Sequence, residues 1–188
     1  MKRIIELRAS NAHRWMVCAG QPQAVAGLIE EASAAADRGT VAHALLEIGL
    51  RLHLSAADLF RYENKAVLQK IEGRRADHIL VDEDMIDGVS HVIDYLNSYV
   101  AKYPNTDYEA ECLLDATAFV GKPSGGTSDL ILHDLPRELV VVDYKNGVQH
   151  VDHIDNHQLR IYCLGAIDRY SEKINLQTKF RTVIIQPN

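Results

Sequence analysis

The chain has 188 residues, 47% of them hydrophobic and 24% charged, which is enough for one buried core and ordinary for a globular domain. Its formal net charge of −6 excludes a protein that coats nucleic acid through bulk positive charge, but it is compatible with an enzyme whose acidic site is screened by metal ions. Three widely spaced cysteines form no C-x-x-C pair and no disulfide framework, and the first residues lack the apolar stretch of a signal peptide. We therefore predict a reducing, cytoplasmic location and no membrane association.

The N-terminal half has the pattern of helices, because apolar residues recur there at helical spacing. We predict helices over the alanine-rich stretch 24–36, from an N-cap at Thr40 to about residue 52, over roughly 57–72 and over 84–102. We find no internal repeat, low-complexity tract or flexible linker. The sequence therefore predicts a single domain over 1–188, mainly helical up to residue 105 and built on a sheet from residue 106.

The hydrophobic period changes after residue 105, where short β-branched or apolar runs alternate with turns that contain Gly or Pro. We predict strands over 108–114, 126–133, 138–144 and 180–186, with a helix over about 154–170 before the last strand. The order is helices followed by β-β-β-α-β. It predicts an α+β or mixed α/β fold in which helices pack against one sheet.

Asp143 and Lys145 come at the end of the most apolar of these runs, Leu139–Val142. Residues two apart in a strand share a face, so the two side chains are expected to point the same way. Charged groups at the end of a strand buried on both faces need a compensating partner, because burying an unpaired charge is costly. The hairpin loop at 133–137 returns the chain, which is expected to bring Asp129 near Asp143.

Two carboxylates and a lysine on adjacent strands are typical of metal-dependent phosphodiester hydrolysis. Asp129 and Asp143 could share one Mg²⁺ or Mn²⁺ through oxygen ligands, while Lys145 orients the attacking water or neutralises developing charge. Each pattern is weak alone, since a D-x-K at a strand end and a turn-forming Gly-Thr-Ser-Asp are both common. The turn between the two aspartates strengthens the hypothesis, because it brings them together.

The segment GTSD…VVDYK followed by HQLRIY resembles the PD-(D/E)XK nuclease superfamily, in the RecB-like and lambda-exonuclease-like branch with a Q-x-x-x-Y helix motif. The resemblance implies a restriction-endonuclease-like core of order αβββαβ with an N-terminal helical part. It places Asp129 at the aspartate of motif II and Asp143 and Lys145 at the (D/E)-x-K of motif III. Gln158 and Tyr162 then occupy the Q-x-x-x-Y positions, four apart on one helix face.

The N-terminal half adds to this resemblance. RGTVAHALLE resembles the helix that carries a metal-binding histidine in this branch, which implies that His43 is a metal ligand. SNAHRWMVCAG resembles the opening Ser…Trp…Cys segment of phage-encoded proteins of this type. Glu111 matches the acidic residue of motif I, with Glu109 as a near competitor.

Plainer interpretations of the same residues stay open. Gln158 and Tyr162 would otherwise be a solvent-facing amide and a half-buried aromatic, and His43 a structural helix residue. Some relatives hold an iron–sulfur cluster with one early and three late cysteines, and this chain lacks the late trio, so we expect no such cluster. Cys112 and Cys163 are interpreted as small core residues.

The resemblance implies a divalent-metal-dependent deoxyribonuclease of a phage or prokaryote, an exonuclease that acts on single- or double-stranded DNA ends in recombination, repair or replication. A structure-selective or nicking endonuclease on the same core is one alternative, and a non-catalytic DNA-binding or assembly subunit is another. The oligomeric state is left open, including a homo-oligomer. No segment resembles a base-reading helix. Lys70, Arg74, Arg75 and Lys122 could track a DNA backbone, although short charged runs are usually solvated.

Overall fold

The computed structural model describes residues 5–28, 33–147 and 150–187, and its contacts group into two compact units. Unit 1 takes in Met1–Glu30, Asp107–Asp143 and Asp152–Val183, and unit 2 takes in Glu31–Thr106, Tyr144–Val151 and Ile184–Asn188. Both units are discontinuous in sequence. The N-terminal segment therefore shares a unit with most of the sheet. The sequence pattern, by contrast, predicts a helical part up to residue 105 and a sheet part after it.

Unit 1 is built on a mixed sheet. Its strands are β1 (Leu7–Arg8), β4 (Asp107–Asp115), β5 (Ser124–Asp134), β6 (Glu138–Tyr144) and β7 (Lys179–Ile185). The order is β1-β5-β6-β7, with β4 also paired to β5. β4 and β6 run antiparallel to β5, whereas β1 runs parallel to it. The last residues of β6 and β7 belong to unit 2. The mixed sheet with helices confirms the predicted fold class.

The strands form where the sequence is most apolar. All seven residues of β6 are buried, and its bounds are those predicted. Leu130, Ile131 and Leu132 of β5 are fully buried as well. A strand buried on both faces needs such an uninterrupted apolar run, because neither face meets water. The predicted strands over 108–114, 126–133 and 180–186 are confirmed, with ends that differ by two residues or fewer.

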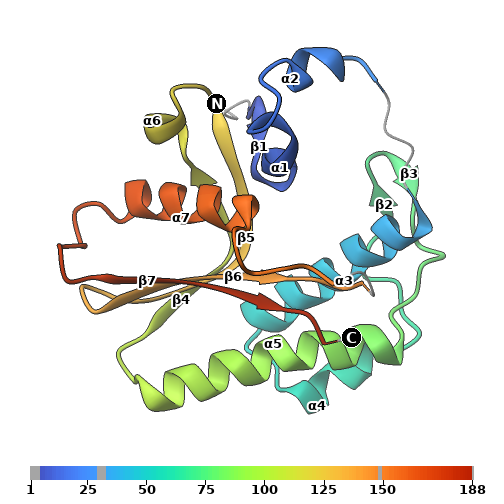
Figure 1. Ribbon diagram of the computed structural model, residues 1–188. Helices are drawn as coiled ribbons and strands as arrows, with labels where there is room; N and C mark the ends of the chain where they lie inside the picture. The colour runs from blue at the N-terminus through green and yellow to red at the C-terminus, as the bar shows by residue number, and fades with distance from the viewer. Residues whose placement is uncertain (1–4, 29–32, 148–149, 188) are drawn as a thin grey trace. The chain divides into compact units, whose positions relative to one another are not determined.

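Helix α7 (His157–Arg169) lies across β4 and β5 within unit 1 (Figure 1). It begins after Asn156, whose side chain accepts a hydrogen bond from Leu159 N at 3.1 Å. Leu159, Tyr162 and Ala166 are buried and lie on one face of the helix. The predicted helix over about 154–170 is therefore confirmed. The shorter helices of unit 1 are η1 (Ala9–Asn11), α1 (Ala12–Trp15), α2 (Gln21–Ala24) and α6 (Thr117–Val120).

Unit 2 is mainly helical, and its two long helices pack against each other (Figure 1). Its elements are α3 (Ala34–Arg51), α4 (Ala56–Leu59), η2 (Phe60–Tyr62), β2 (Lys70–Ile71), β3 (Arg74–Arg75) and α5 (Glu83–Lys102). The predicted helix over 84–102 is confirmed by α5. Its N-cap is Asp82, which accepts a hydrogen bond from Met85 N at 3.0 Å. Within the described ranges no helix is both long and apolar enough to cross a membrane.

Two predictions in unit 2 are wrong. Thr40 is not an N-cap, because α3 begins earlier, at Ala34, after the N-cap Ser33, whose side chain accepts a hydrogen bond from Ala36 N at 3.1 Å. Thr40 lies inside the helix and donates to the Ala36 carbonyl. The predicted helix over 57–72 ends by residue 62 and is followed by the β2–β3 hairpin, in which Gly73 has φ +83°. The predicted helix over 24–36 is divided between α2 and α3, and its residues 29–32 lie outside the described part of the chain.

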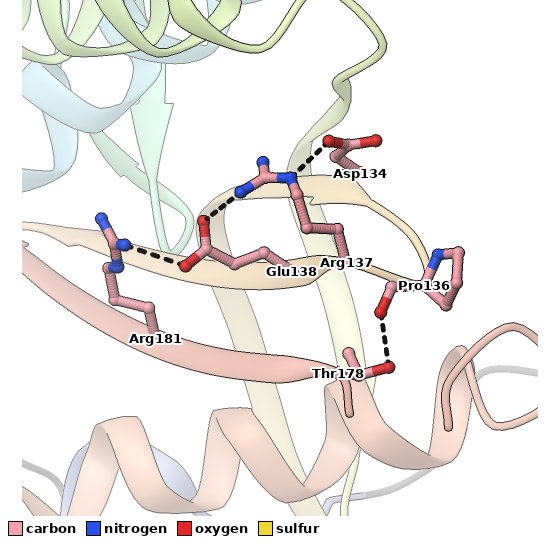
Figure 2. Close-up of polar contacts among 6 residues, drawn as sticks. All are labelled: Asp134, Pro136, Arg137, Glu138, Thr178 and Arg181. Carbon is pink, nitrogen blue, oxygen red and sulfur yellow. Dashed lines mark hydrogen bonds and ion pairs between the residues drawn. The ribbon is translucent and has the colours of Figure 1, made fainter. Parts of the chain in front are cut away.

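A buried acid joins the β5–β6 hairpin to β7 (Figure 2). Glu138 is 2% exposed and pairs with Arg137 at 3.3 Å and with Arg181 at 2.9 Å. Arg137 also pairs with Asp134 at 2.6 Å, and Thr178 Oγ1 donates to the Pro136 carbonyl at 2.8 Å. The two guanidinium groups neutralise a carboxylate that would otherwise be costly to bury.

Candidate functional site

Three carboxylates from neighbouring strands of unit 1 lie in one row. The antiparallel β4–β5 register continues on both sides of Glu111 and sets it opposite Asp129. The β5–β6 register pairs Leu130 with Val142, so the next position sets Asp129 opposite Asp143. The expectation that the β5–β6 hairpin brings Asp129 and Asp143 together therefore agrees with the strand register. We call Glu111, Asp129 and Asp143 the acidic row.

The acidic row has two features that a purely structural sheet avoids. Carboxylate oxygens of Glu111 and Asp129 lie within 4.8 Å of each other, and like charges on directly opposed residues destabilise a strand pair. Glu111 also has φ +50° inside a strand, a left-handed conformation that is uncommon and strained for a glutamate. Hard carboxylate oxygens at this spacing fit a divalent cation, which would neutralise the repulsion.

The row is largely shielded from solvent. Asp129 is 7% exposed and Asp143 is 3% exposed, whereas Glu111 is half-buried. Solvent therefore reaches the row more readily at Glu111 than at the two aspartates. Burial strengthens electrostatic interactions, so a cation would be held more firmly here than by the same carboxylates at the surface.

Gln158 connects the row to α7. Its Nε2 donates to Asp143 Oδ1 at 3.1 Å and to the Tyr162 hydroxyl at 3.1 Å, which uses both protons of the amide nitrogen. Burial raises the pKa of Tyr162 well above its usual range, and the charges of Asp143, Asp129 and Glu111 raise it further. The Tyr162 phenol therefore stays protonated beside the row. The expectation that Gln158 and Tyr162 share one helix face is confirmed by this contact.

Glycines allow α7 to approach the sheet closely enough for these contacts. A Cβ added at Gly126 would lie 3.0 Å from Tyr162 Cε1, and one added at Gly165 would lie 2.9 Å from Leu114 Cβ. Gly125 has φ +143°, and a Cβ there would lie 2.0 Å from the Leu114 carbonyl oxygen. The GG pair before Thr-Ser-Asp lies inside β5 and is needed for packing rather than for a turn, a role that sequence reasoning missed.

His43 and Lys145, the other two predicted site residues, belong to unit 2. The His43 ring on α3 lies 5.3 Å from the Tyr144 ring, centroid to centroid, at an interplanar angle of 58°. Helix α5 approaches the same tyrosine at Gly88, where an added Cβ would lie 2.3 Å from the Tyr144 hydroxyl. Lys145 follows β6 directly, and its backbone N–H donates to the Ile185 carbonyl at 3.0 Å. Their roles beside the acidic row stay predictions.

Glu109, the competitor of Glu111, has a different environment. It accepts hydrogen bonds from Arg169 Nη2 at 2.5 Å and from the Tyr170 hydroxyl, and His133 Nε2 lies 3.9 Å from its carboxylate. Burial opposes ionisation, but the hydrogen bonds from Tyr170 and Arg169 outweigh it and hold the pKa of Glu109 below its usual value. Glu111, and not Glu109, lies beside Asp129.

Cys112 and Cys163 lie in surroundings that disfavour ionisation of their thiols. Cys112 is 5% exposed, and burial raises the pKa of its thiol to about 11. Cys163 is half-buried, and burial raises its pKa as well. Burial therefore disfavours the thiolate form of both side chains. The prediction of a core role is confirmed for Cys112.

Three of the basic residues that could track DNA, Lys70, Arg74 and Arg75, lie on the β2–β3 hairpin of unit 2. Arg74 makes a bidentate ion pair with Asp37, with both distances at 2.8 Å. Arg75 pairs in the same way with Asp77, at 2.6 and 2.9 Å. Carboxylates thus balance both guanidinium groups, which weakens the expectation that they track a DNA backbone.

One family model matches this chain, over residues 5–188, and it is described as "Protein of unknown function (DUF2800)". The matched segment contains the acidic row, Gln158 and Tyr162 in unit 1 and the helix with His43 in unit 2. Nearly the whole chain is therefore covered, and the protein belongs to the DUF2800 family.

Proposed function

We propose that the protein is a divalent-metal-dependent deoxyribonuclease. The observation that carries the proposal is the acidic row, in which Glu111, Asp129 and Asp143 come from three adjacent strands and Gln158 bridges Asp143 to Tyr162. A structural role does not account for three like charges side by side, with Glu111 at one end in a positive-φ conformation. The resemblance to PD-(D/E)XK nucleases, with the core order αβββαβ, is part of the same proposal.

The donor set of the row suits Mg²⁺ or Mn²⁺, since it consists of hard carboxylate oxygens. When bound, such a cation polarises a phosphoryl oxygen and lowers the pKa of water. Asp129 and Asp143 would hold the cation, and Glu111 would add a third carboxylate. Gln158 fixes the orientation of the Asp143 carboxylate through its hydrogen bond.

Two further residues complete the proposed chemistry. The resemblance implies that Lys145, two positions after Asp143, neutralises charge that develops on the phosphate. The resemblance also implies that His43 supplies an imidazole ligand, which would make the donor set softer than oxygen alone. We expect Mn²⁺ to bind more tightly than Mg²⁺ and His43→Ala to narrow that difference in isothermal titration. An unchanged affinity ratio would leave His43 with only its contact to Tyr144.

We propose that the enzyme works from DNA ends. The Q-x-x-x-Y branch that the sequence resembles is rich in end-processing enzymes, and no segment of the sequence has the pattern of a base-reading helix. Without base readout, selectivity comes from the shape of the nucleic acid, and a free or frayed terminus is the simplest shape to select.

The test is to incubate the protein with linear duplex, linear single-stranded DNA and covalently closed circular duplex, with Mg²⁺, with Mn²⁺ and with EDTA. We expect progressive loss of linear DNA with either metal, survival of the closed circles and no cleavage in EDTA. Cleavage of closed circles at the rate of linear DNA would make the protein a structure-selective or nicking endonuclease. A complete lack of cleavage, together with no thermal stabilisation by either metal, would support the non-catalytic subunit instead.

A further inference from the structure

A second feature of unit 1 lies outside the acidic row. The N-terminal elements β1, α1 and α2 lie together (Figure 1) and enclose a hollow of about 390 Å³, whose lining includes Glu6, Arg8, Asn11, Trp15 and Gln21. We call it the Trp15 hollow. Its lining combines an aromatic ring, a guanidinium group and two side-chain amides. Groups of these kinds bind nucleotides, because bases offer π faces and hydrogen-bonding edges and phosphates offer negative charge.

The indole ring in this hollow is held in place by the chain itself. Trp15 Nε1 donates to the Arg8 carbonyl at 2.9 Å, which satisfies the only polar group of the side chain. Trp15 is half-buried, so the ring is anchored without being enclosed. A ring whose N–H already has a partner offers a ligand its π face rather than a hydrogen bond.

The charge of this region differs from that of the rest of the protein. The described residues 5–28 contain two arginines, Arg8 and Arg14, and one acidic residue, Glu6, whereas the whole chain has 20 Lys and Arg against 26 Asp and Glu. Arg8 and Arg14 are exposed. A local excess of positive charge on an otherwise acidic protein attracts a polyanion to this region and away from the remaining surface.

The hollow also lies close to the acidic row within unit 1. Strand β1 pairs with the start of β5, so that Arg8 is opposite Gly125. A Cβ added at the neighbouring Gly126 would lie 3.5 Å from Ala9 Cβ and 3.0 Å from Tyr162. Gly126 is three residues from Asp129 along β5, about 10 Å in a strand. A strand with a phosphodiester at the row could therefore reach the hollow with a nearby nucleotide.

We propose that the Trp15 hollow binds single-stranded nucleic acid by stacking one base on Trp15. Arg8 contacts a phosphate, and the amides of Asn11 and Gln21 hydrogen-bond to the base edge. Glu6 is the acidic lining residue; its carboxylate only accepts hydrogen bonds, so it faces an exocyclic amino group of a base such as cytosine. This inference rests on the proposed nuclease function for the nature of the polymer. The Trp15 hollow would bind the strand before its phosphodiester reaches the acidic row.

The chain offers a direct probe, because Trp15 is its only tryptophan. Intrinsic fluorescence is followed while a short oligodeoxycytidine is added in EDTA, so that no cleavage takes place. We expect saturable quenching that weakens as salt is added, because phosphate contacts contribute to binding. Failure of the indole emission to change, at oligonucleotide concentrations where fluorescence anisotropy shows the labelled strand to be bound, would overturn the proposal. Absence of any binding to the strand would overturn it as well.

Variants separate stacking from a general effect on the fold. With a labelled oligodeoxycytidine, Trp15→Ala should raise the dissociation constant about tenfold, the size expected when one stacked base is lost, whereas Trp15→Phe keeps an aromatic ring and should stay close to the wild type. Val17→Ala is the matched control, since Val17 is in the same segment, is 83% exposed and lies outside the hollow lining. Equal affinity of wild type and Trp15→Ala, or equal losses in Trp15→Ala and Val17→Ala, would contradict the proposal. Trp15→Phe keeps the test valid even if Trp15→Ala unfolds.

The outcome for the hollow is independent of the outcome for cleavage. All binding measurements are made without metal, so a protein that binds the strand through Trp15 but never cleaves it would support this inference and contradict the proposed function. If the protein is an active metal-dependent nuclease and its Trp15→Ala variant binds and cleaves single strands like the wild type, the proposed function is supported and this inference is contradicted.

Discussion

Glu109 and Glu111 lie two residues apart on β4, yet their neighbours carry opposite charge. Glu109 accepts hydrogen bonds from Arg169 and Tyr170, so a cation balances its carboxylate. Glu111 lies beside Asp129, a second carboxylate. The strand sequence alone presents both as acidic residues near a predicted motif. The charge of the surrounding groups separates an acid paired with a cation from one placed beside another carboxylate.

Glu138 belongs to the same class as Glu109. It is almost fully buried and lies between Arg137 and Arg181 (Figure 2), as expected for an acid whose burial is compensated by guanidinium groups. Asp129 and Asp143 are buried to a similar degree, but they neighbour each other in the strand register. Burial alone therefore does not identify a functional acid in this protein. The proposed site depends on burial among other carboxylates.

The largest effect that would test this comparison is on cleavage. Asp143→Asn and Asp129→Asn should each lower the cleavage rate by about 10³-fold or more, because each removes a formal charge from the proposed metal ligands. The fold should persist, since an Asn oxygen at position 143 still accepts the hydrogen bond from Gln158. The rate is measured on linear DNA with saturating Mn²⁺, and Asp168→Asn, an exposed acid on α7, is the control. Full activity of Asp143→Asn would refute the site assignment.

An intermediate effect should distinguish the two glutamates of β4. Glu109→Gln should lower the free energy of unfolding by about 1–3 kcal/mol, because Arg169 and Tyr170 lose a charged acceptor, and should leave cleavage near the wild-type rate. Glu111→Gln should show the opposite result, with slower cleavage and unchanged or higher stability, because repulsion with Asp129 is removed. Urea unfolding and cleavage assays on both variants check this. Equal behaviour of the two variants would show that neighbouring charge does not separate their roles.

The smallest effect concerns His133, whose ring lies 4.9 Å from that of Tyr170, centroid to centroid. Burial lowers the pKa of His133, while the carboxylates of Asp107 and Glu109 act in the opposite direction and Lys173 and Arg169 reinforce the decrease. The unfolded chain therefore binds the proton more readily, and stability should fall as pH drops through about 6.5, the ordinary value.

The melting temperature should accordingly decrease, on the order of 1 °C, between about pH 7.5 and pH 5.5. His133→Asn should flatten the dependence in this range. The lowered pKa of Glu109 acts in a separate window: its contribution is present above about pH 4.5 and is lost as pH falls further. A dependence that is identical in wild type and His133→Asn would exclude this histidine as its source.

Local pattern was sufficient for much of the fold. The apolar run of β6 predicted a central strand with its observed bounds, because burial on both faces leaves no room for polar alternation. The spacing of Gln158 and Tyr162 predicted a shared helix face, since four residues make about one helical turn. The turn at 133–137 predicted that Asp129 and Asp143 would be neighbours, and the strand register agrees. Each of these conclusions depends on residues close together in the chain.

Tertiary structure decided the rest. Nothing in the segment around Glu109 and Glu111 says which of them meets Asp129, because the answer depends on the strand register, on the positive φ of Glu111 and on Arg169 and Tyr170 at the far end of α7. The N-cap of α3 was misplaced because both Ser33 and Thr40 are good capping residues, and only one of them receives an amide hydrogen bond at the helix start. Periodicity fixes which face of an element is apolar, but contacts between segments distant in sequence fix which charges lie side by side.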